Sequence, residues 1–271
     1  MTPKTKYFFS ILIVSIFSGI TPLYAGPVTD GLVGYWQLNG NGEDATTSNF
    51  DGVLSGGASY VYSDAVFQES LHVSGGSYFQ VPSNSLLNLT DEITISLWIK
   101  PNSLSSYQSL VAKWANTSSG QPASERSYLF YIKDSNLLPF VQTGGIISSY
   151  ESSPVLTQGE WQQVTMTYSS SDESLKAYLN GSYLGEQYVT GLMSSTNTMP
   201  LLFGAFSYSG GAYSFSGYID EVKIFDRALT QPEINEDYQY VLNGMQTPVP
   251  EPLSLVLLSI ASLFLRIKKR M

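Results

Sequence analysis

Hydrophobic and polar side chains alternate along many short segments of the chain. In "EITISLWIKP" an aliphatic side chain occupies every second position from Ile93 to Ile99. In "WQQVTMTYSS" Val164, Met166 and Tyr168 follow the same spacing. Because successive side chains of a strand point to opposite faces of its sheet, this period of two predicts β-strands with one buried face.

Turn signals separate these segments and indicate how they pair. "SLKAYLNGSYLGEQYV" holds Asn180-Gly181 between two alternating runs, which is the sequence of a tight β-hairpin. "RSYLFYIKD", "MPLLFGAF" and "GYIDEVKIFD" predict further strands, with Gly-, Ser- and Asn-rich turns between them. The chain has no long amphipathic pattern and no alternation of strands with helices. We therefore expect an all-β fold, a two-sheet antiparallel sandwich over residues 28–243.

One helix is predicted at the end of this region. In "LTQPEINEDYQYVL" Thr230 and Glu233 have the spacing of a capping box, and Pro232 lies in the first turn, where proline is tolerated. We expect residues 244–248 to form a linker. The Gly-rich stretch 207–217 is typical of a mobile loop or hairpin.

Residues 1–25 have the pattern of a secretory signal peptide. Lys4 and Lys6 precede the apolar stretch "YFFSILIVSIF", and Leu23-Tyr24-Ala25 is an acceptable cleavage site. The alternative is an uncleaved N-terminal anchor. The shortness of the apolar run and its interruption by "GITPLYAG" disfavour that alternative.

A second apolar segment, residues 253–267, precedes a basic tail at 268–271. As a transmembrane helix it would reach about 22 Å, less than the roughly 30 Å of a hydrocarbon core. Arg266 and the terminal lysines can extend toward the headgroups, and their charge keeps this end cytoplasmic. A basic ending disfavours a eukaryotic lipid-anchor signal.

The residues before this helix complete a recognisable pattern. Val249, Pro250, Glu251 and Pro252, the apolar helix and the basic tail together resemble the PEP-CTERM sorting signal of Gram-negative bacteria. The resemblance implies that an exosortase, a membrane cysteine peptidase, processes residues 249–271. The protein would be held transiently in the inner membrane and then reach the cell surface or extracellular matrix. The prolines favour the extended conformation that a peptidase requires. The alternative is an ordinary tail anchor with a proline-rich kink.

Composition narrows the chemistry of the region between the two ends. The 271 residues include no cysteine, which excludes disulfides, thiolate metal sites and a cysteine nucleophile. The single histidine, His72, rules out a multi-histidine metal site and fits a strand residue better than a general base. Between residues 26 and 250, seven basic residues stand against 21 acidic ones. This acidic balance argues against nucleic acid as a partner.

Four stretches resemble the laminin G-like, concanavalin A-like jelly roll of bacterial surface proteins. They are "GLVGYWQLNGNGED", "ITISLWIKP", "GEWQQVTMTYSSSDESLKAYLNGSYLG" and "FSGYIDEVKIFDRALTQPEI", which span nearly all of residues 31–235. The resemblance implies a jelly-roll sandwich with Trp36, Trp98 and Trp161 in or near the core. Many relatives carry a cysteine pair that this chain lacks, so its stability must come from the core alone.

Some jelly rolls of this kind are glycoside hydrolases, which need two carboxylates about 5–9 Å apart. The Glu-x-Asp pattern of laminarinase-like enzymes does not occur in the chain. Adjacent acids on a strand, such as Asp220 and Glu221, point to opposite faces and make a poor acid/base pair. Acids from separate strands could still meet, so a glycan-active enzyme stays an open alternative.

The same resemblance implies a Ca²⁺ ion at the rim of the sandwich, held by acidic side chains and backbone carbonyls. Asp44 and Asp220 lie in the matching stretches and are the expected ligands. The alternative is that Asp44 caps a turn and that Asp220 accepts hydrogen bonds from backbone amides.

Exposed aromatic side chains could stack on sugars. Trp114, Tyr208 and Tyr213 are the expected ligand-binding residues, the two tyrosines lying in the Gly-rich stretch. The alternative for Trp114 is that it packs at a sheet edge. We therefore expect a non-enzymatic exported protein that binds an extracellular polysaccharide or a surface protein. A glycan-active enzyme and a passive structural component of the matrix are the alternatives.

Overall fold

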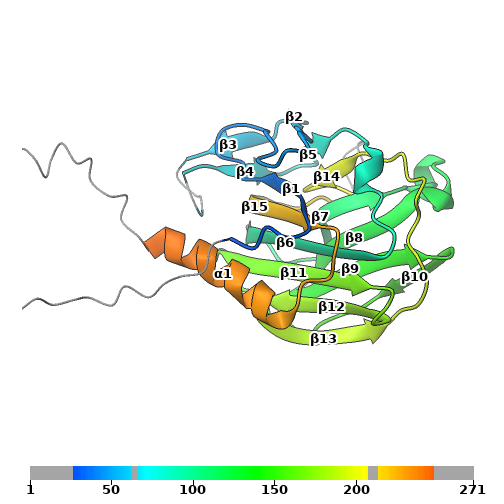
Figure 1. Cartoon of the computed structure of the whole chain (residues 1–271). Helices are drawn as coiled ribbons and strands as arrows, with labels where there is room; N and C mark the ends of the chain where they lie inside the picture. The colour runs from blue at the N-terminus through cyan, green and yellow to red at the C-terminus, as the bar shows by residue number, and fades with distance from the viewer. Residues whose placement is uncertain (1–26, 63–65, 67, 207–212, 247–271) are drawn as a thin grey trace, which may run out of the picture.

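The computed structural model describes residues 27–62, 66, 68–206 and 213–246. Two antiparallel β-sheets of jelly-roll type face each other, and one helix lies against the outside of the sandwich (Figure 1). The predicted fold class is therefore confirmed. Across the described residues, no helix has the length and apolarity needed to cross a membrane. The predicted signal peptide and the apolar segment 253–267 lie outside the described residues.

The first sheet, called sheet A here, has eight strands. Its path runs β13-β12-β11-β6-β15-β4-β3, and β1 also pairs with β15. The strands are β1 (Leu32–Trp36), β3 (Ser59–Val61), β4 (Ser70–Val73), β6 (Glu92–Pro101), β11 (Gln162–Ser169), β12 (Ser174–Leu179), β13 (Ser182–Tyr188) and β15 (Gly217–Phe225). At the centre, Ile99 of β6 is in register with Gln162 on one side and Ile219 on the other.

The second sheet, sheet B, has seven strands in the order β10-β9-β8-β7-β14-β5-β2. They are β2 (Val53–Ser55), β5 (Tyr78–Val81), β7 (Tyr107–Trp114), β8 (Arg126–Lys133), β9 (Asn136–Thr143), β10 (Ile146–Ser149) and β14 (Leu201–Phe203). Three 3-10 turns interrupt the loops: η1 (Ser85–Leu87), η2 (Thr117–Ser119) and η3 (Ala123–Glu125).

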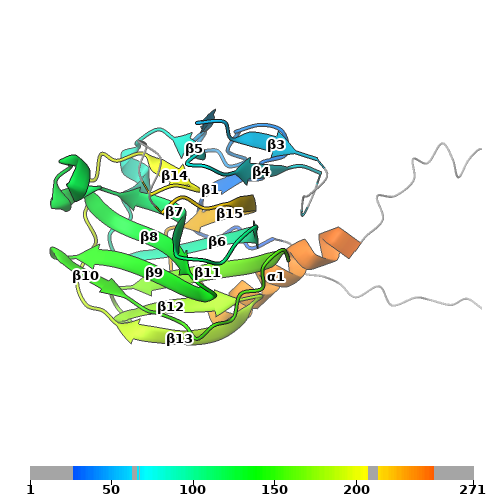
Figure 2. The same ribbon diagram turned by 180° about the vertical axis from the view of Figure 1, so that it is seen from behind.

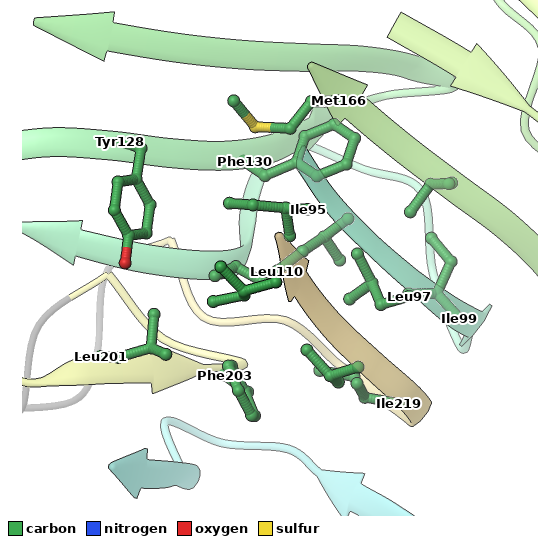
Figure 3. Close-up of a cluster of buried hydrophobic side chains, with 14 of the residues drawn as sticks. Ile95, Leu97, Ile99, Leu110, Tyr128, Phe130, Met166, Leu201, Phe203 and Ile219 are labelled. Carbon is green, nitrogen blue, oxygen red and sulfur yellow. The ribbon is translucent and has the colours of Figure 1, made fainter. Parts of the chain in front are cut away.

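The main core lies between the two sheets. Ile95, Leu97 and Ile99 of β6 meet Tyr128 and Phe130 of β8 across this layer (Figure 3). These side chains are alternate positions of their strands, so the period of two seen in the sequence marks the face that points into the inter-sheet core. The intervening residues of both strands are buried as well, on the outer faces of the sheets. Burial of this apolar surface, without any disulfide, is the main stabilising term.

The hairpin predicted at Asn180-Gly181 joins β12 to β13. Both turn residues have left-handed backbone angles, with φ of 49° at Asn180 and 75° at Gly181. Asn and Gly tolerate this region better than other residues, which is why the pair favours a two-residue turn. The carboxamide oxygen of Asn180 also accepts the backbone N–H of Gln163 at 2.9 Å, which ties the turn to β11.

Helix α1 (Gln231–Gln246) covers the outer face of sheet A and continues three residues into the expected linker. The Glu233 carboxylate accepts both the N–H and the hydroxyl of Thr230 at 2.8 Å, which confirms the predicted capping pair. Arg227 donates to the same carboxylate, and these bonds lower the pKa of Glu233 to about 2. On the inner side of the helix, Tyr238 stacks on Trp98 with ring centres 5.6 Å apart.

Candidate ligand-binding groove

The outer face of sheet B carries its own cluster of apolar and aromatic side chains. Along β8, Tyr128 and Phe130 point into the main core, whereas Leu129 and Tyr131 belong to this second cluster. No described helix lies over this face, which is turned toward the viewer in Figure 2. Because an outward strand face is normally polar, an aromatic one indicates a surface for binding.

A groove of about 240 Å³ opens on this face. Its aromatic lining residues are Tyr107, Trp114, Tyr131, Phe140, Phe206 and Tyr213. Leu129, Ile147 and Arg126 complete the lining. The groove therefore combines several aromatic rings with one positive charge.

Tyr131 is the centre of the aromatic cluster. Its ring centre lies 5.7 Å from that of Phe140, 5.9 Å from Phe206 and 6.0 Å from both Tyr107 and Tyr213. The Tyr107 and Phe140 contacts are edge-to-face, the geometry that aromatic quadrupoles favour. Such contacts hold the rings in fixed positions.

The phenol of Tyr131 is held in its neutral form. Burial raises its pKa, and the neighbouring Tyr213 and Tyr107 phenols raise it further. A neutral phenol both donates and accepts hydrogen bonds.

Tyr213 is the most exposed aromatic residue of the groove, with 47% of its surface accessible. Its backbone is fixed: the carbonyl accepts the N–H of Ser109 at 2.7 Å, and φ is 64°. A left-handed conformation is costly for a tyrosine, and such strain is found mainly where function requires a position. The exposed ring is thus presented from an anchored backbone.

Trp114 lies at the end of β7, an interior strand of sheet B, and is only 6% exposed. The Arg126 guanidinium sits 5.5 Å from the centre of the Trp114 ring, a cation–π contact. The same guanidinium donates to the Ala115 carbonyl at 3.2 Å and to the Thr117 hydroxyl at 2.8 Å. Trp114 therefore supports Arg126 rather than offering an open platform.

The structure places two of the three expected ligand-binding residues, Trp114 and Tyr213, on the same groove. Tyr208 lies outside the described residues. Trp114 is packed, as the alternative expected, although it lies on an interior strand, because β7 is flanked by β8 and β14. Sequence reasoning missed Arg126 and Tyr131, although "RSYLFYIKD" alternates tyrosines between the two faces of β8.

Asp44 organises the loop after β1. Its Oδ1 accepts the N–H of Tyr35 and of Thr46, at 2.9 and 3.0 Å. Its Oδ2 accepts the Thr46 hydroxyl at 2.8 Å and the Phe50 N–H at 3.0 Å. A carboxylate has room for about four such bonds, so this one has little capacity left for a cation.

Asp220 is fully buried in β15 and also accepts backbone N–H groups, from Val66 at 2.9 Å and from Glu221 at 3.0 Å. Within the described part of the chain, no three His, Cys, Asp or Glu side chains come together as a metal site would need. The donor sets of Asp44 and Asp220 do not fit a Ca²⁺ site. Calcium binding elsewhere on the chain stays a prediction.

Under α1, the outer face of sheet A holds a buried charged network that the sequence did not reveal. Lys223 of β15 and Asp237 of α1 form an ion pair at 2.5 Å, and both side chains are only 2% exposed. Gln163 and Ser96 donate to the other oxygen of Asp237, at 3.0 and 3.3 Å. These bonds fix the helix to the sheet by polar as well as apolar contacts.

Glu221 completes this network. It accepts the Tyr35 hydroxyl, while its second oxygen has no partner in the described structure. Burial raises the pKa of Glu221 to about 7, against the opposing effects of Lys223 and the Tyr35 hydrogen bond. Burial and the nearby Glu221 carboxylate also raise the pKa of Tyr35.

A second hollow, of about 520 Å³, lies on sheet A beside the start of α1. Tyr178 and Tyr183 line it, with ring centres 5.7 Å apart. Its lysine, Lys176, is paired with Glu186 at 3.7 Å. Because this cation is already paired and fewer aromatic rings converge here, the groove on sheet B is the stronger candidate.

These features define the protein as an all-β jelly-roll sandwich with one sheet covered by a helix and one open, aromatic sheet. A laminin G-like family model of the concanavalin A-like lectin/glucanases superfamily matches residues 73–235, and the chain belongs to this family. Among curated proteins, none matches the sequence significantly.

Solved structures with similar folds include saccharide complexes. Domain 4 of AbnA, a GH43 extracellular arabinanase from Geobacillus stearothermophilus, was solved with arabinotriose. It aligns with a TM-score of 0.59 and 17% identity, over 77% of this chain and 98% of that one. The ligand-binding domain of botulinum neurotoxin serotype D was solved with N-acetylneuraminic acid. It aligns with a TM-score of 0.57 and 16% identity, over 78% of this chain and 51% of that one.

The binding domain of Paraclostridial Mosquitocidal Protein 1 aligns with a TM-score of 0.63 and 18% identity, over 79% of this chain and 53% of that one. The chain thus spans about half of the toxin binding domains and nearly all of the arabinanase domain. At these identities the likeness establishes a shared fold.

Proposed function

We propose that the protein is a non-enzymatic saccharide-binding module and that its ligand occupies the groove on sheet B. The observation that carries this proposal is the group of preassembled aromatic rings around Tyr131, with Tyr213 half-exposed above it. Aromatic faces pack against the C–H faces of sugar rings, and phenol hydroxyls bond to sugar hydroxyls. Similar folds that were solved with arabinotriose and N-acetylneuraminic acid support this class of ligand.

The buried position of the acid pair under α1 favours binding over hydrolysis. Asp237 lies near enough to Glu221 for its charge to raise the pKa of Glu221, but both residues are buried beneath α1. A polysaccharide cannot reach them there. A hydrolase would instead need an exposed carboxylate pair about 5–9 Å apart.

The test is a glycan array probed with the full-length protein, with and without Ca²⁺. Tyr213→Ala should weaken binding to the recognised glycan by about tenfold, because it removes the exposed ring. Tyr188→Ala is the matched control, since Tyr188 is 67% exposed on β13 of the other sheet and lies outside the groove. Equal losses in the two variants would contradict the assignment of the groove.

The same array separates the alternative functions. A passive matrix component would bind no glycan saturably. A glycan-active enzyme would release reducing ends from a recognised glycan, and replacement of a facing acid pair would abolish that release.

We also propose that the protein is exported and delivered through its C-terminal sorting signal, whose motif runs from Val249 to Pro252. In a host with the matching exosortase, the mature protein should lack this tail and leave the inner membrane. Joint replacement of Pro250 and Glu251 by alanine should leave it membrane-bound. Normal processing of that variant would refute the sorting proposal.

A further inference from the structure

We propose that the groove selects saccharides bearing an anionic group, a carboxylate or a sulfate ester, and that Arg126 binds this group. The inference rests on the proposed function, because it specifies the ligand of the same groove. It depends on how Arg126 is held, on which partners its charge has, and on the size of the groove.

Arg126 is positioned in advance of any ligand. Its Nε donates to the Ala115 carbonyl, and its Nη2 donates to the Thr117 hydroxyl. The guanidinium carbon also lies over the Trp114 ring, 5.5 Å from the ring centre. The other terminal nitrogen, Nη1, has no hydrogen-bond partner among the described residues. A guanidinium that is fixed on one side and free on the other loses little entropy when it binds an anion.

Other cations among the described residues, one of them buried, are neutralised differently. Several pair with carboxylates: Lys133 with Glu151, Lys176 with Glu186, Lys223 with Asp237, and Arg227 with Asp30 and Glu233. Arg126 has no carboxylate within ion-pair distance in the described part of the chain. This is unexpected in a chain with 22 acidic and 13 basic residues.

The nearest acid in sequence, Glu125, is directed elsewhere. Its Oε2 accepts the backbone N–H of Thr198, and its backbone carbonyl accepts the side chain of Asn197. Glu125 therefore holds the loop around residues 197–199 and leaves the charge of Arg126 available to the groove. The planar fork of a guanidinium matches the two oxygens of a carboxylate or sulfate.

The groove's volume of about 240 Å³ is below the 300–1,000 Å³ or so of pockets for drug-sized ligands. Such a groove suits one or two sugar units. Selectivity must then come from the substituents of those units, and the charged one would lie beside Arg126.

The experiment uses isothermal titration of the full-length protein with matched pairs of short saccharides. One pair is trigalacturonate and its carboxyl-reduced, neutral counterpart. The second pair is a sulfated galactose trisaccharide and its unsulfated form. The acidic member of at least one pair should bind about tenfold or more tightly than its neutral partner, as expected for a charge-assisted contact. The pair that shows the preference identifies the anionic group.

Arg126→Gln should abolish this preference. Arg126→Lys should keep only part of it, because an ammonium retains the charge and loses the fork. Lys176→Gln is the matched control: it removes the same charge from sheet A, outside the groove, at a residue already paired with Glu186 at 3.7 Å. That variant should retain the preference. Thermal melting checks each fold, and Thr117→Ala, which removes one support of the guanidinium, should reduce the preference if Arg126→Gln does not fold.

The outcomes separate this inference from the proposed function. Equal binding of acidic and neutral saccharides would overturn the inference and leave the saccharide-binding proposal standing. Equal losses of preference in Arg126→Gln and Lys176→Gln would also overturn it, because the effect would then reflect overall charge. If no saccharide bound at all, both proposals would fail.

Discussion

The outer face of sheet A lies under helix α1, whereas the outer face of sheet B lies open (Figure 1, Figure 2). Under the helix, the charged residues of β15 are paired within the protein, and Lys223 meets Asp237 at 2.5 Å. On the open sheet, Arg126 packs on Trp114, and no carboxylate of the described residues lies within ion-pair distance of it. The covered face pairs its buried cation within the protein, and the open face carries a cation that no carboxylate of the described residues neutralises.

The difference shows the desolvation penalty of covering a sheet face that carries charged residues. Buried charges lose their hydration, and the loss is offset only when each meets a well-placed partner. Asp237 has three such partners, Lys223, Gln163 and Ser96. Glu221 is less well satisfied, since one of its oxygens is unpartnered. The aromatic open face avoids this cost by exposing rings and keeping few charges.

The largest expected effect comes from breaking the ion pair on the covered face. Asp237→Ala would leave the Lys223 ammonium buried without its counter-charge. It should lower the free energy of unfolding by about 3–5 kcal/mol, as measured by urea denaturation.

The control for this prediction lies outside the covered face. Glu151 pairs with Lys133, but its side chain is 45% exposed. Glu151→Ala should therefore cost at most about 1 kcal/mol. Replacing both members of the buried pair, as Lys223→Met with Asp237→Leu, should recover much of the loss. Similar small losses in Asp237→Ala and Glu151→Ala would refute the contrast between the two faces.

The sequence predicted the inner faces of the strands better than their outer faces. The alternation from Ile93 to Ile99 identified the core side of β6 because a buried apolar face leaves a period of two. The other side of β6 carries Thr94 and Ser96, which are also buried, under α1. Alternation cannot distinguish a polar face in water from one beneath a helix, since both carry polar residues.

The candidate site was predictable in part for a similar reason. Trp114 and Tyr213 attracted attention as large aromatics near turns, and both line the groove. Arg126 was not predicted, because two features of the tertiary structure make it a candidate. One is its contact with Trp114 on the neighbouring strand, and the other is that it has no carboxylate within ion-pair distance among the described residues. Asp44 and Asp220 were matched to a calcium site by the family resemblance, yet their carboxylates accept backbone N–H groups. Such partners are set by tertiary structure.

The second prediction concerns pH and Glu221. Its pKa is raised from an ordinary 4.5 to about 7, so between these values the folded chain binds more protons than the unfolded chain. Stability from this group is therefore full below about pH 4.5 and lost as pH rises through 7. The shift corresponds to about 3 kcal/mol at most. Glu233, whose pKa is lowered to about 2, acts in the opposite sense but below this window.

Glu221→Gln keeps a hydrogen-bonding partner for Tyr35 and removes the titration. The variant should be more stable than the natural protein at pH 8, and its free energy of unfolding should vary less between pH 5 and pH 8. Denaturation at several pH values measures both quantities. An unchanged slope would mean that Glu221 is ionised in the fold at neutral pH, and the covered face would then tolerate charge better than its burial indicates.

The smallest expected effect compares one tyrosine on each face. Tyr238 of α1 stacks on Trp98 at 5.6 Å, so Tyr238→Ala should destabilise the fold by about 2 kcal/mol. Tyr213→Ala should cost less than about 1 kcal/mol, because its ring is already 47% exposed and alanine keeps the same backbone strain. Urea denaturation provides both values. If Tyr213→Ala proved as costly as Tyr238→Ala, the groove's rings would be structural packing rather than a surface held ready for a ligand. A small cost together with lost saccharide binding would separate the ligand role of the open face from the structural role of the covered one.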